Sequence, residues 1–291
     1  MPIIQAVVVV YRRALSECES IQSLARINKS DPHLYSSLRL LIQDNSPVGQ
    51  PAGARPLPSS EFVHCPENPG LAGAYNRALS HAVRNHAKWL MLLDQDTDLS
   101  ATYLEKVLEA VASRCQDNIG AFAPKLYDGD RLLSPYRVSR RSMKLISDEF
   151  VGISDEMLWP FSSASVISVE ALQRIGGFAP DYPLDYLDNV TFSRLYRAGF
   201  VTYILDAKLQ HSLSYLDMEH KMSLSRYRDV LSAHWRVYRE NGIGVSPIGY
   251  RAYLILRGLK QALLFKNKKY SIETFRSALS RFPERISVQK Q

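Results

Sequence analysis

The stretch that decides the fold is Trp89–Leu99, which reads WLMLLDQDTDL. Its first five residues form a continuous apolar run, typical of a strand buried on both faces of a parallel sheet. The run ends in three acids, Asp94, Asp96 and Asp98. Because ligands of open α/β sheets bind beyond the carboxyl ends of the strands, these acids are predicted to lie where a ligand binds.

The spacing of Asp94 and Asp96 has two interpretations. Two hard oxygen ligands just past a strand suit Mg²⁺ or Mn²⁺, particularly when a bound diphosphate supplies further oxygens. A bare D-x-D also occurs by chance, and the acids then belong to a polar turn before a helix, with Asp98 or Ser100 as the N-cap. The motifs elsewhere in the chain decide between the two.

Strand-like and helix-like segments alternate around this stretch. Apolar runs predict strands at 3–10, 38–42, 62–65, 89–93 and 120–123. Helical spacing of apolar residues predicts helices at 15–27, 71–83 and 101–114. This alternation indicates a parallel α/β sheet with right-handed crossovers.

The glycines of residues 68–76, NPGLAGAYN, match neither the dinucleotide fingerprint nor the phosphate loop. The mismatch argues against a Rossmann dehydrogenase and against a kinase. For Gly70 and Gly73 we expect a tight turn and close packing of a helix on the sheet.

A further acidic cluster lies in the second half of the chain. Residues 127–160 predict hairpins or mobile loops beside the site, and strands are expected at 161–169 and 201–205 around a short helix at 170–175. Asp188 lies six residues before Arg194 at the start of a helix that ends at Gly199, where it either caps the helix or does chemistry. His211 follows on an expected loop.

Composition excludes several classes of protein. Of the 291 residues, 46% are hydrophobic and 22% are charged, as in an ordinary folded domain. No apolar run approaches the roughly 20 residues that cross a bilayer, and the first residues, MPIIQAVVVVYRR, indicate a strand rather than a signal peptide. Cys18, Cys65 and Cys115 show no paired or metal-like spacing, which indicates reduced thiols in the cytoplasm.

The net charge of +7 is concentrated in the tail. Residues 245–291 carry ten Lys or Arg and two Asp or Glu, whereas the rest of the chain carries 26 and 27. This distribution argues against a nucleic-acid-binding module. Helical patterns at 217–240 and 248–265, followed by KNKK at 266–269, predict basic helices that lie on a membrane surface with anionic lipids. Packing on the rest of the chain and a homodimer contact are the alternatives.

The motifs follow one another in a recognisable order. They are VVVVY, QDNS, ENPGLAGAYNRAL, LLDQD, SSASVISVEALQRIGGF, DYLDNVTFSRLYRAGF and the His211 segment. The series resembles the inverting glycosyltransferases of family 2, which have the GT-A fold, and is most similar to the bacterial rhamnosyltransferases of cell-surface polysaccharide synthesis. The resemblance covers roughly residues 3–240 and is weakest at 127–160.

The resemblance implies a domain organisation. The expected fold is α/β and GT-A, that is, a Rossmann-like, mostly parallel central sheet flanked by helices, with a C-terminal helical extension. The catalytic domain is expected over 1–215, with a nucleotide-binding half at about 1–125 and an acceptor-side half at about 126–215. A basic helical region follows at 216–291.

The resemblance also implies roles for individual residues. Asp188 is the implied general base, with Asp185 as the alternative. The implied ligands of Mg²⁺ or Mn²⁺ are Asp96, Asp94 and His211. The residues implied to contact the donor nucleotide are Tyr11, Asp44, Asn76 and Asp94.

The sequence departs from the family pattern at three positions. Leu187 and Val190 stand where the family has acids, and Arg77 stands where many relatives have a smaller residue. These changes affect the expected acceptor geometry more than the reaction type.

The implied reaction is metal-dependent transfer of a sugar in a single displacement with inversion. The resemblance favours L-rhamnose from dTDP-rhamnose, moved onto a saccharide or lipid-diphosphate-linked acceptor of O-antigen or capsule at the cytoplasmic face of the inner membrane. Alternatives are a UDP-sugar donor, such as UDP-galactofuranose or UDP-N-acetylglucosamine, and a nucleotide-sugar-binding scaffold that has lost catalysis.

Overall fold

The computed structural model describes residues 4–51, 57–113, 118–139, 142–211, 222–240 and 246–280. By its internal contacts the chain divides into two compact units. The first comprises residues 1–139 and 143–212, and the second comprises residues 140–142 and 213–291. Each unit is described by itself.

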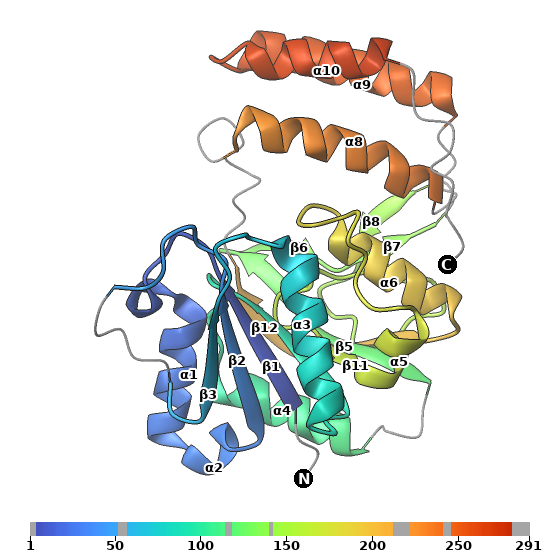
Figure 1. The fold of residues 1–291 in the computed structure, drawn as a ribbon. Helices are drawn as coiled ribbons and strands as arrows, with labels where there is room; N and C mark the ends of the chain where they lie inside the picture. Colours follow the sequence, from blue (N-terminus) through green and yellow to red (C-terminus); the bar gives the residue numbers. More distant parts are fainter. Residues whose placement is uncertain are drawn as a thin grey trace. The chain divides into compact units, whose positions relative to one another are not determined.

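The first unit is built on a sheet of nine strands among the described residues, in the order β3-β2-β1-β4-β11-β5-β12-β9, with β6 paired to β5 (Figure 1). The principal strands are β1 (Ile4–Val10), β2 (Leu38–Asp44), β3 (Ser60–His64), β4 (Trp89–Asp94), β5 (Ile119–Asp128), β11 (Val166–Ser168) and β12 (Val201–Gln210). Strands β1 to β4 are mutually parallel and β12 is parallel to β5, whereas β11 is antiparallel to both of its neighbours. The sheet is therefore mostly parallel, as the apolar runs predicted.

Helices cover both faces of this sheet. They are α1 (Glu19–Ser30), α2 (Pro32–Tyr35), α3 (Gly70–Arg84), α4 (Ala101–Ser113), α5 (Val169–Arg174) and α6 (Leu187–Arg197), with a 3-10 turn η1 at Leu15–Glu17. Alternate residues of β1, such as Ile4 and Val8, share one buried cluster with α1, α2 and α4. Their neighbours Val7 and Val9 point to the opposite face, along which α3 lies against β1 and β4. Burial on both faces explains why β1 is apolar except for Gln5.

Two segments beside the candidate site differ from their sequence-based assignments. The strand expected at 161–169 is confined to β11, because Ser162–Ser165 form a turn that brings hydroxyl groups to the end of β4. Strand β12 runs five residues beyond its expected end, so His211 lies in a bridge to Thr97 rather than on a loop. The 127–160 region forms mainly hairpin-like pairs of short strands, which is one of the two alternatives expected there: β6 (Arg131–Ser134), β7 (Tyr136–Val138), β8 (Met143–Leu145), β9 (Gly152–Ile153) and β10 (Met157–Trp159).

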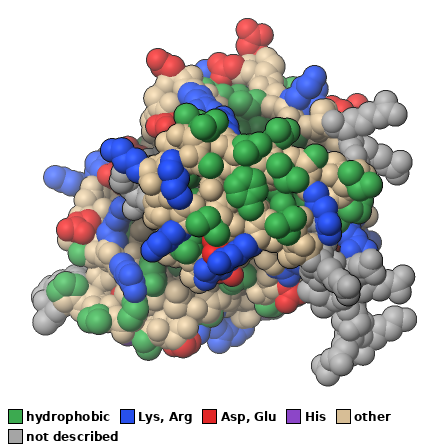
Figure 2. Space-filling model, turned by 90° about the horizontal axis from the view of Figure 1, so that it is seen from above, with side chains coloured by type: hydrophobic (Ala, Val, Ile, Leu, Met, Phe, Trp, Pro, Cys, Tyr) green, Lys and Arg blue, Asp and Glu red, His purple; other side chains and the backbone are tan. Residues whose placement is uncertain are grey.

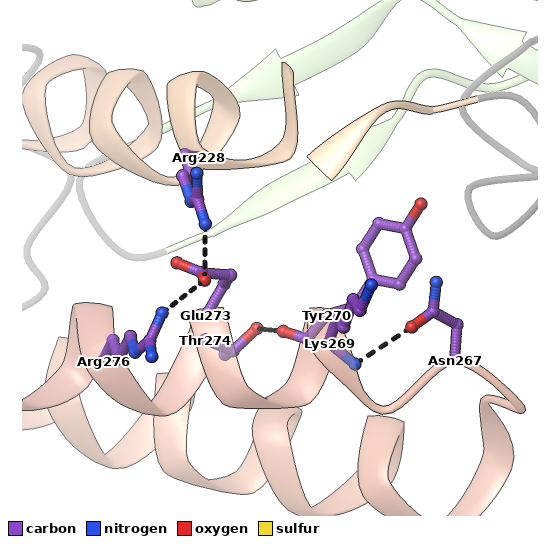
Figure 3. Close-up of polar contacts among 7 residues, drawn as sticks. All are labelled: Arg228, Asn267, Lys269, Tyr270, Glu273, Thr274 and Arg276. Carbon is purple, nitrogen blue, oxygen red and sulfur yellow. Dashed lines mark hydrogen bonds and ion pairs between the residues drawn. The ribbon is translucent and has the colours of Figure 1, made fainter. Parts of the chain in front are cut away.

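The second unit contains the helices α8 (Leu224–Glu240), α9 (Pro247–Leu264) and α10 (Lys269–Leu279). Helices α9 and α10 approach closely at Gly258, where an added Cβ would lie 2.8 Å from the Phe275 ring. Glu273 of α10 forms ion pairs with Arg228 of α8 at 2.9 Å and with Arg276 at 2.8 Å (Figure 3). Residues 217–221 of the expected helix at 217–240 lie outside the described residues. In the described part of the chain, no helix is both long and apolar enough to cross a membrane.

Candidate active site

The acids predicted at the strand ends do meet at one edge of the sheet. Strand β1 lies between β2 and β4, with Val10 level with Asp44 on one side and Val9 level with Asp94 on the other. Parallel pairing therefore brings residues 50 positions apart to the same edge, which is where ligands of open α/β sheets bind.

Asp94, Asp96 and His211 form a group that could hold a metal ion. Their ligand atoms all lie within 4.8 Å of one another, and His211 Nδ1 is 3.8 Å from an oxygen of Asp96. The histidine is held by its backbone, since its N–H donates to the Tyr127 carbonyl at 2.8 Å. Its buried Nδ1 has no hydrogen-bond partner among the described residues. An unsatisfied imidazole nitrogen beside two carboxylates is the arrangement that a divalent cation would complete.

The electrostatics of this group also favour a cation. Burial raises the pKa of Asp96, and the negative charge of Asp94 raises it further, while His211 partly offsets both. Two carboxylates in a half-buried position repel each other unless a proton or a positive ion lies between them. The residues present therefore fit a Mg²⁺ or Mn²⁺ ion.

Three hydroxyl groups hold Asp94 and the loop that follows it. Tyr75 donates from its hydroxyl to Asp94 Oδ1 at 3.2 Å, and Ser163 donates to Oδ2. Ser20 donates to the backbone carbonyls of Asp94 and of Thr97, the latter at 3.0 Å. The sequence analysis missed these residues, because no local pattern indicates which hydroxyls fold against a strand end.

Asp188 lies in the first turn of α6 and is half-buried. Burial raises the pKa of its carboxyl from 3.8 to about 6, and the charge of Asp94 acts in the same direction. Hydrogen bonds from the backbone and the hydroxyl of Ser162 pull the pKa down and so limit the rise. A carboxylate with a pKa near 6 is largely ionised at neutral pH and still basic enough to take a proton. Asp185, the alternative base, is half-buried just before the same helix.

Helix α3 fixes the segment that carries Asp188. Its first N–H groups donate to the Pro183 carbonyl, from Leu71 at 2.6 Å and from Ala72 at 3.3 Å. Gly70 has a φ of +71°, and a Cβ there would lie 2.4 Å from that same carbonyl oxygen. Gly70 is therefore needed for a close approach to the Asp188 segment, in addition to the tight turn that we expected.

Asn76, which the resemblance placed at the donor nucleotide, has a structural role in this arrangement. Its amide donates to the Phe178 carbonyl at 2.8 Å and accepts from the Phe178 N–H at 2.9 Å. Gly177 has a φ of +76°, and an added Cβ would lie 2.6 Å from Asn76 Oδ1. Both polar ends of Asn76 are thus bonded to the backbone of Phe178.

Tyr11 and Asp44 come just before the two chain segments that line a hollow beyond the ends of β1 and β2. Asp44 has no exposed surface, and its two oxygens accept from the Ser46 N–H at 2.9 Å and from the Gln50 amide at 2.8 Å. These bonds shape the 46–51 loop, which lines a hollow of about 390 Å³ together with Arg12, Arg13 and Ala14. Tyr11 is 39% exposed, and its N–H donates to Gln95 of the D-x-D loop at 3.0 Å. In this structure Asp44 thus holds the loop that lines the hollow.

Two of the three departures from the family pattern are core residues, and the third is exposed. Leu187 and Val190 are buried on the inner side of α6. Arg77 donates to the sulfur of the buried Cys65 at 3.3 Å. Asp94, Asp96, Asp188 and His211 are all present despite these three departures.

Comparisons with known proteins agree with this geometry. The sequence profile described as Glycosyl transferase family 2 matches residues 6–176. In fold, the chain is similar to the mannosyltransferase PcManGT from Pyrobaculum calidifontis in complex with GDP-Man and Mn²⁺, with 15% identity and a TM-score of 0.55 over 96% of this chain and 87% of that one. It is also similar to S. aureus TarS 1-349, with 11% identity and a TM-score of 0.52 over 95% and 90% of the two chains. At these identities the likeness concerns the fold, which is GT-A with C-terminal helices. Comparison with curated protein sequences gave no significant match.

Proposed function

Because the chain belongs to glycosyl transferase family 2, we propose that it transfers a sugar from a nucleotide donor to an acceptor hydroxyl in one metal-dependent step with inversion. The observation that carries this proposal is that a possible metal-binding group and a partly buried carboxyl influence each other at one edge of the sheet. The Asp94, Asp96 and His211 group lies there, and the charge of Asp94 is felt by the partly buried carboxyl of Asp188.

Each residue of the site has a proposed role. Asp96, Asp94 and His211 hold Mg²⁺ or Mn²⁺, which when bound neutralises the charge that develops on the departing diphosphate. Asp188 takes the proton of the acceptor hydroxyl. At the same time the acceptor oxygen bonds to the anomeric carbon, and the bond between that carbon and the diphosphate oxygen breaks. Ser162 orients Asp188 and tunes its pKa. Attack from the face opposite the leaving group inverts the anomeric carbon, so the enzyme needs no nucleophile of its own.

We propose dTDP-L-rhamnose as the donor. The support is the series of motifs between Tyr11 and His211, whose order resembles that of the bacterial rhamnosyltransferases. UDP-galactofuranose and UDP-N-acetylglucosamine are the alternatives. Tyr11 and the loop held by Asp44 form the proposed nucleoside side of the site, beside the hollow lined by Arg12 and Arg13. The GDP-Man and Mn²⁺ of the similar mannosyltransferase support a nucleotide-sugar donor and a divalent ion here.

The proposed acceptor is a saccharide, free or carried on a lipid diphosphate, of a bacterial surface polysaccharide such as O-antigen or capsule. This acceptor places the protein on the cytoplasmic face of the inner membrane, as a peripheral protein. A nucleotide-sugar-binding scaffold without activity is the competing function, and only the loss of acids at Leu187 and Val190 favours it.

The first experiment is a thermal-shift panel of dTDP-rhamnose, UDP-galactofuranose and UDP-N-acetylglucosamine, each with and without Mg²⁺ or Mn²⁺. A ligand at 100 times its Kd stabilises the folded state by about 2.7 kcal/mol, which is readily measured. A metal-dependent shift with dTDP-rhamnose alone supports the rhamnosyl donor, and a shift with a UDP-sugar instead moves the assignment to that donor. Binding without release of nucleoside diphosphate over a range of saccharide acceptors favours the scaffold.

A matched pair of variants tests the metal group in the same panel. Asp96→Asn removes one expected ligand, and we expect it to abolish the metal-dependent part of the shift. Asp98→Asn is the control, because Asp98 belongs to the same acidic stretch but pairs with Arg26 on the surface. Equal losses in the two variants would contradict the assignment of Asp96.

A further inference from the structure

Helix α9 has a second apolar face that no described residue covers. Ile248, Ala252, Ile255, Leu256, Leu259 and Leu263, here called the α9 outer stripe, are all exposed. The exposed fraction reaches 80% for Ile248 and 83% for Leu263. At 3.6 residues per turn these positions fall within an arc of about 100°, the width of an ordinary buried helix face. The opposite side of α9, with Tyr250 and Leu254, is the one that packs inside the unit.

The charge around this stripe has one sign. Described residues 246–280 contain seven Lys or Arg and a single acid, Glu273. That acid is nearly buried and is paired with Arg228 and Arg276, so it adds no exposed negative charge to this face (Figure 3). By helix geometry, Arg251 and Lys260 border the stripe on its two sides. Figure 2 shows hydrophobic side chains gathered over α9 and α10, with Lys and Arg side chains around them.

A hollow on α9 combines the same two kinds of side chain. Its volume is about 490 Å³, and its lining includes the apolar Leu256, Leu264 and Phe265 together with Arg257 and Lys260. An apolar floor with basic groups beside it suits an amphiphile with an anionic head, because the chain and the head each meet a matching surface.

We propose that the α9 outer stripe docks on the surface of a lipid bilayer that contains anionic phospholipids. The stripe would enter the interface between headgroups and acyl chains, and the basic residues would contact the headgroups. A second copy of this chain is a poorer occupant, since pairing the same face twice brings like charges together, and residues 246–280 place no exposed acid between them. The inference rests on the second unit alone and does not depend on the proposed transfer reaction.

Vesicle flotation of the full chain tests the proposal, with vesicles of phosphatidylcholine alone or mixed with phosphatidylglycerol. We expect binding to the mixed vesicles that weakens as salt is added, and little binding to phosphatidylcholine. Leu256→Gln with Leu263→Gln keeps the charge and should reduce partitioning about tenfold or more, since two large apolar side chains are lost from the interface. Lys260→Gln with Lys266→Gln should weaken the preference for anionic lipid and its dependence on salt, because two of the seven basic residues are lost.

Val83→Gln is the matched control, because Val83 is a 40% exposed apolar residue on α3 of the first unit. It should float like the wild type. Failure of the wild type to bind the mixed vesicles, or equal binding to both vesicle types at all salt concentrations, would overturn the proposal. So would a dimer in solution that the double leucine variant dissociates while vesicle binding is unchanged. Donor-dependent thermal shifts are read separately, so a failure here leaves the transfer reaction untouched.

Discussion

The replacement of Asp188 by Asn should make the protein more stable and almost inactive. The pKa of the carboxyl rises from 3.8 to about 6 in the folded protein, mainly through burial. A difference of this size means that the ionised carboxyl destabilises the folded protein by about 3 kcal/mol. Below pH 4 the carboxyl keeps its proton in both the folded and the unfolded protein, so this destabilisation vanishes. As the pH rises from about 4 to about 6 the unfolded chain loses its proton first, so wild-type stability falls, and above about 6 the full cost persists.

Asn has nearly the same shape as Asp and no charge to bury. Thermal unfolding in the presence of a chelator, which keeps the neighbouring Asp94 free of metal, should therefore show a variant with a higher Tm at pH 8. A gain of about 3 kcal/mol corresponds to roughly 6–12 °C in a domain of this size. At pH 4 the difference should be small. Turnover should fall by about 10²–10⁴-fold, the usual contribution of a general base, with donor binding little changed.

Asp185→Asn is the matched control for this experiment, because Asp185 is the neighbouring acid and the alternative base. It should retain turnover. Near-normal turnover of Asp188→Asn would show that Asp188 is not the base, and loss of turnover in Asp185→Asn alone would transfer that role. A lower Tm of Asp188→Asn at pH 8 would contradict the argument from burial.

Three further substitutions test the supports of the site. His211→Ala should abolish the shift in Tm produced by Mn²⁺, measured by thermal unfolding with and without the ion, since it removes the histidine of the metal group. Gly70→Ala should cost about 2 kcal/mol or more in denaturant unfolding, because its Cβ would meet the Pro183 carbonyl, whereas Gly129→Ala, at a φ of +58° in open space, should cost about 1 kcal/mol. Ser162→Ala removes a hydrogen bond that lowers the pKa of the proposed base, so the acid limb of the pH–rate profile should move to higher pH; an unmoved limb would contradict this role.

Much of the sheet was predictable because burial leaves a mark in the sequence. A parallel strand covered on both faces is a nearly continuous apolar run, as β4 is and as β1 is apart from its buried Gln5. In β4 the first polar residue, Asp94, ends the strand. The acids of the D-x-D stretch were therefore expected at the ligand edge, where they lie. The exposed apolar face of α9 was equally visible, because helical periodicity is a local property.

Long-range contacts left no such mark. The short strand β11 inserts between β4 and β5 and brings Ser163 to Asp94, although these two residues are 69 positions apart. The sequence analysis expected a longer strand there and found no role for the serines. His211 was expected on a loop, and the extension of β12 instead makes it buried and fixed.

The sequence by itself determined the kind of fold, the family and the chemical types of the site residues, because these depend on apolar periodicity and on the order of short motifs. Only the tertiary structure decided the surroundings of those residues. It buries Asp44 and occupies Asn76 with backbone contacts, whereas it raises the pKa of Asp188 toward neutrality. The reason is that a carboxyl or an amide takes its properties from the atoms around it, and those atoms come from elements far away along the chain.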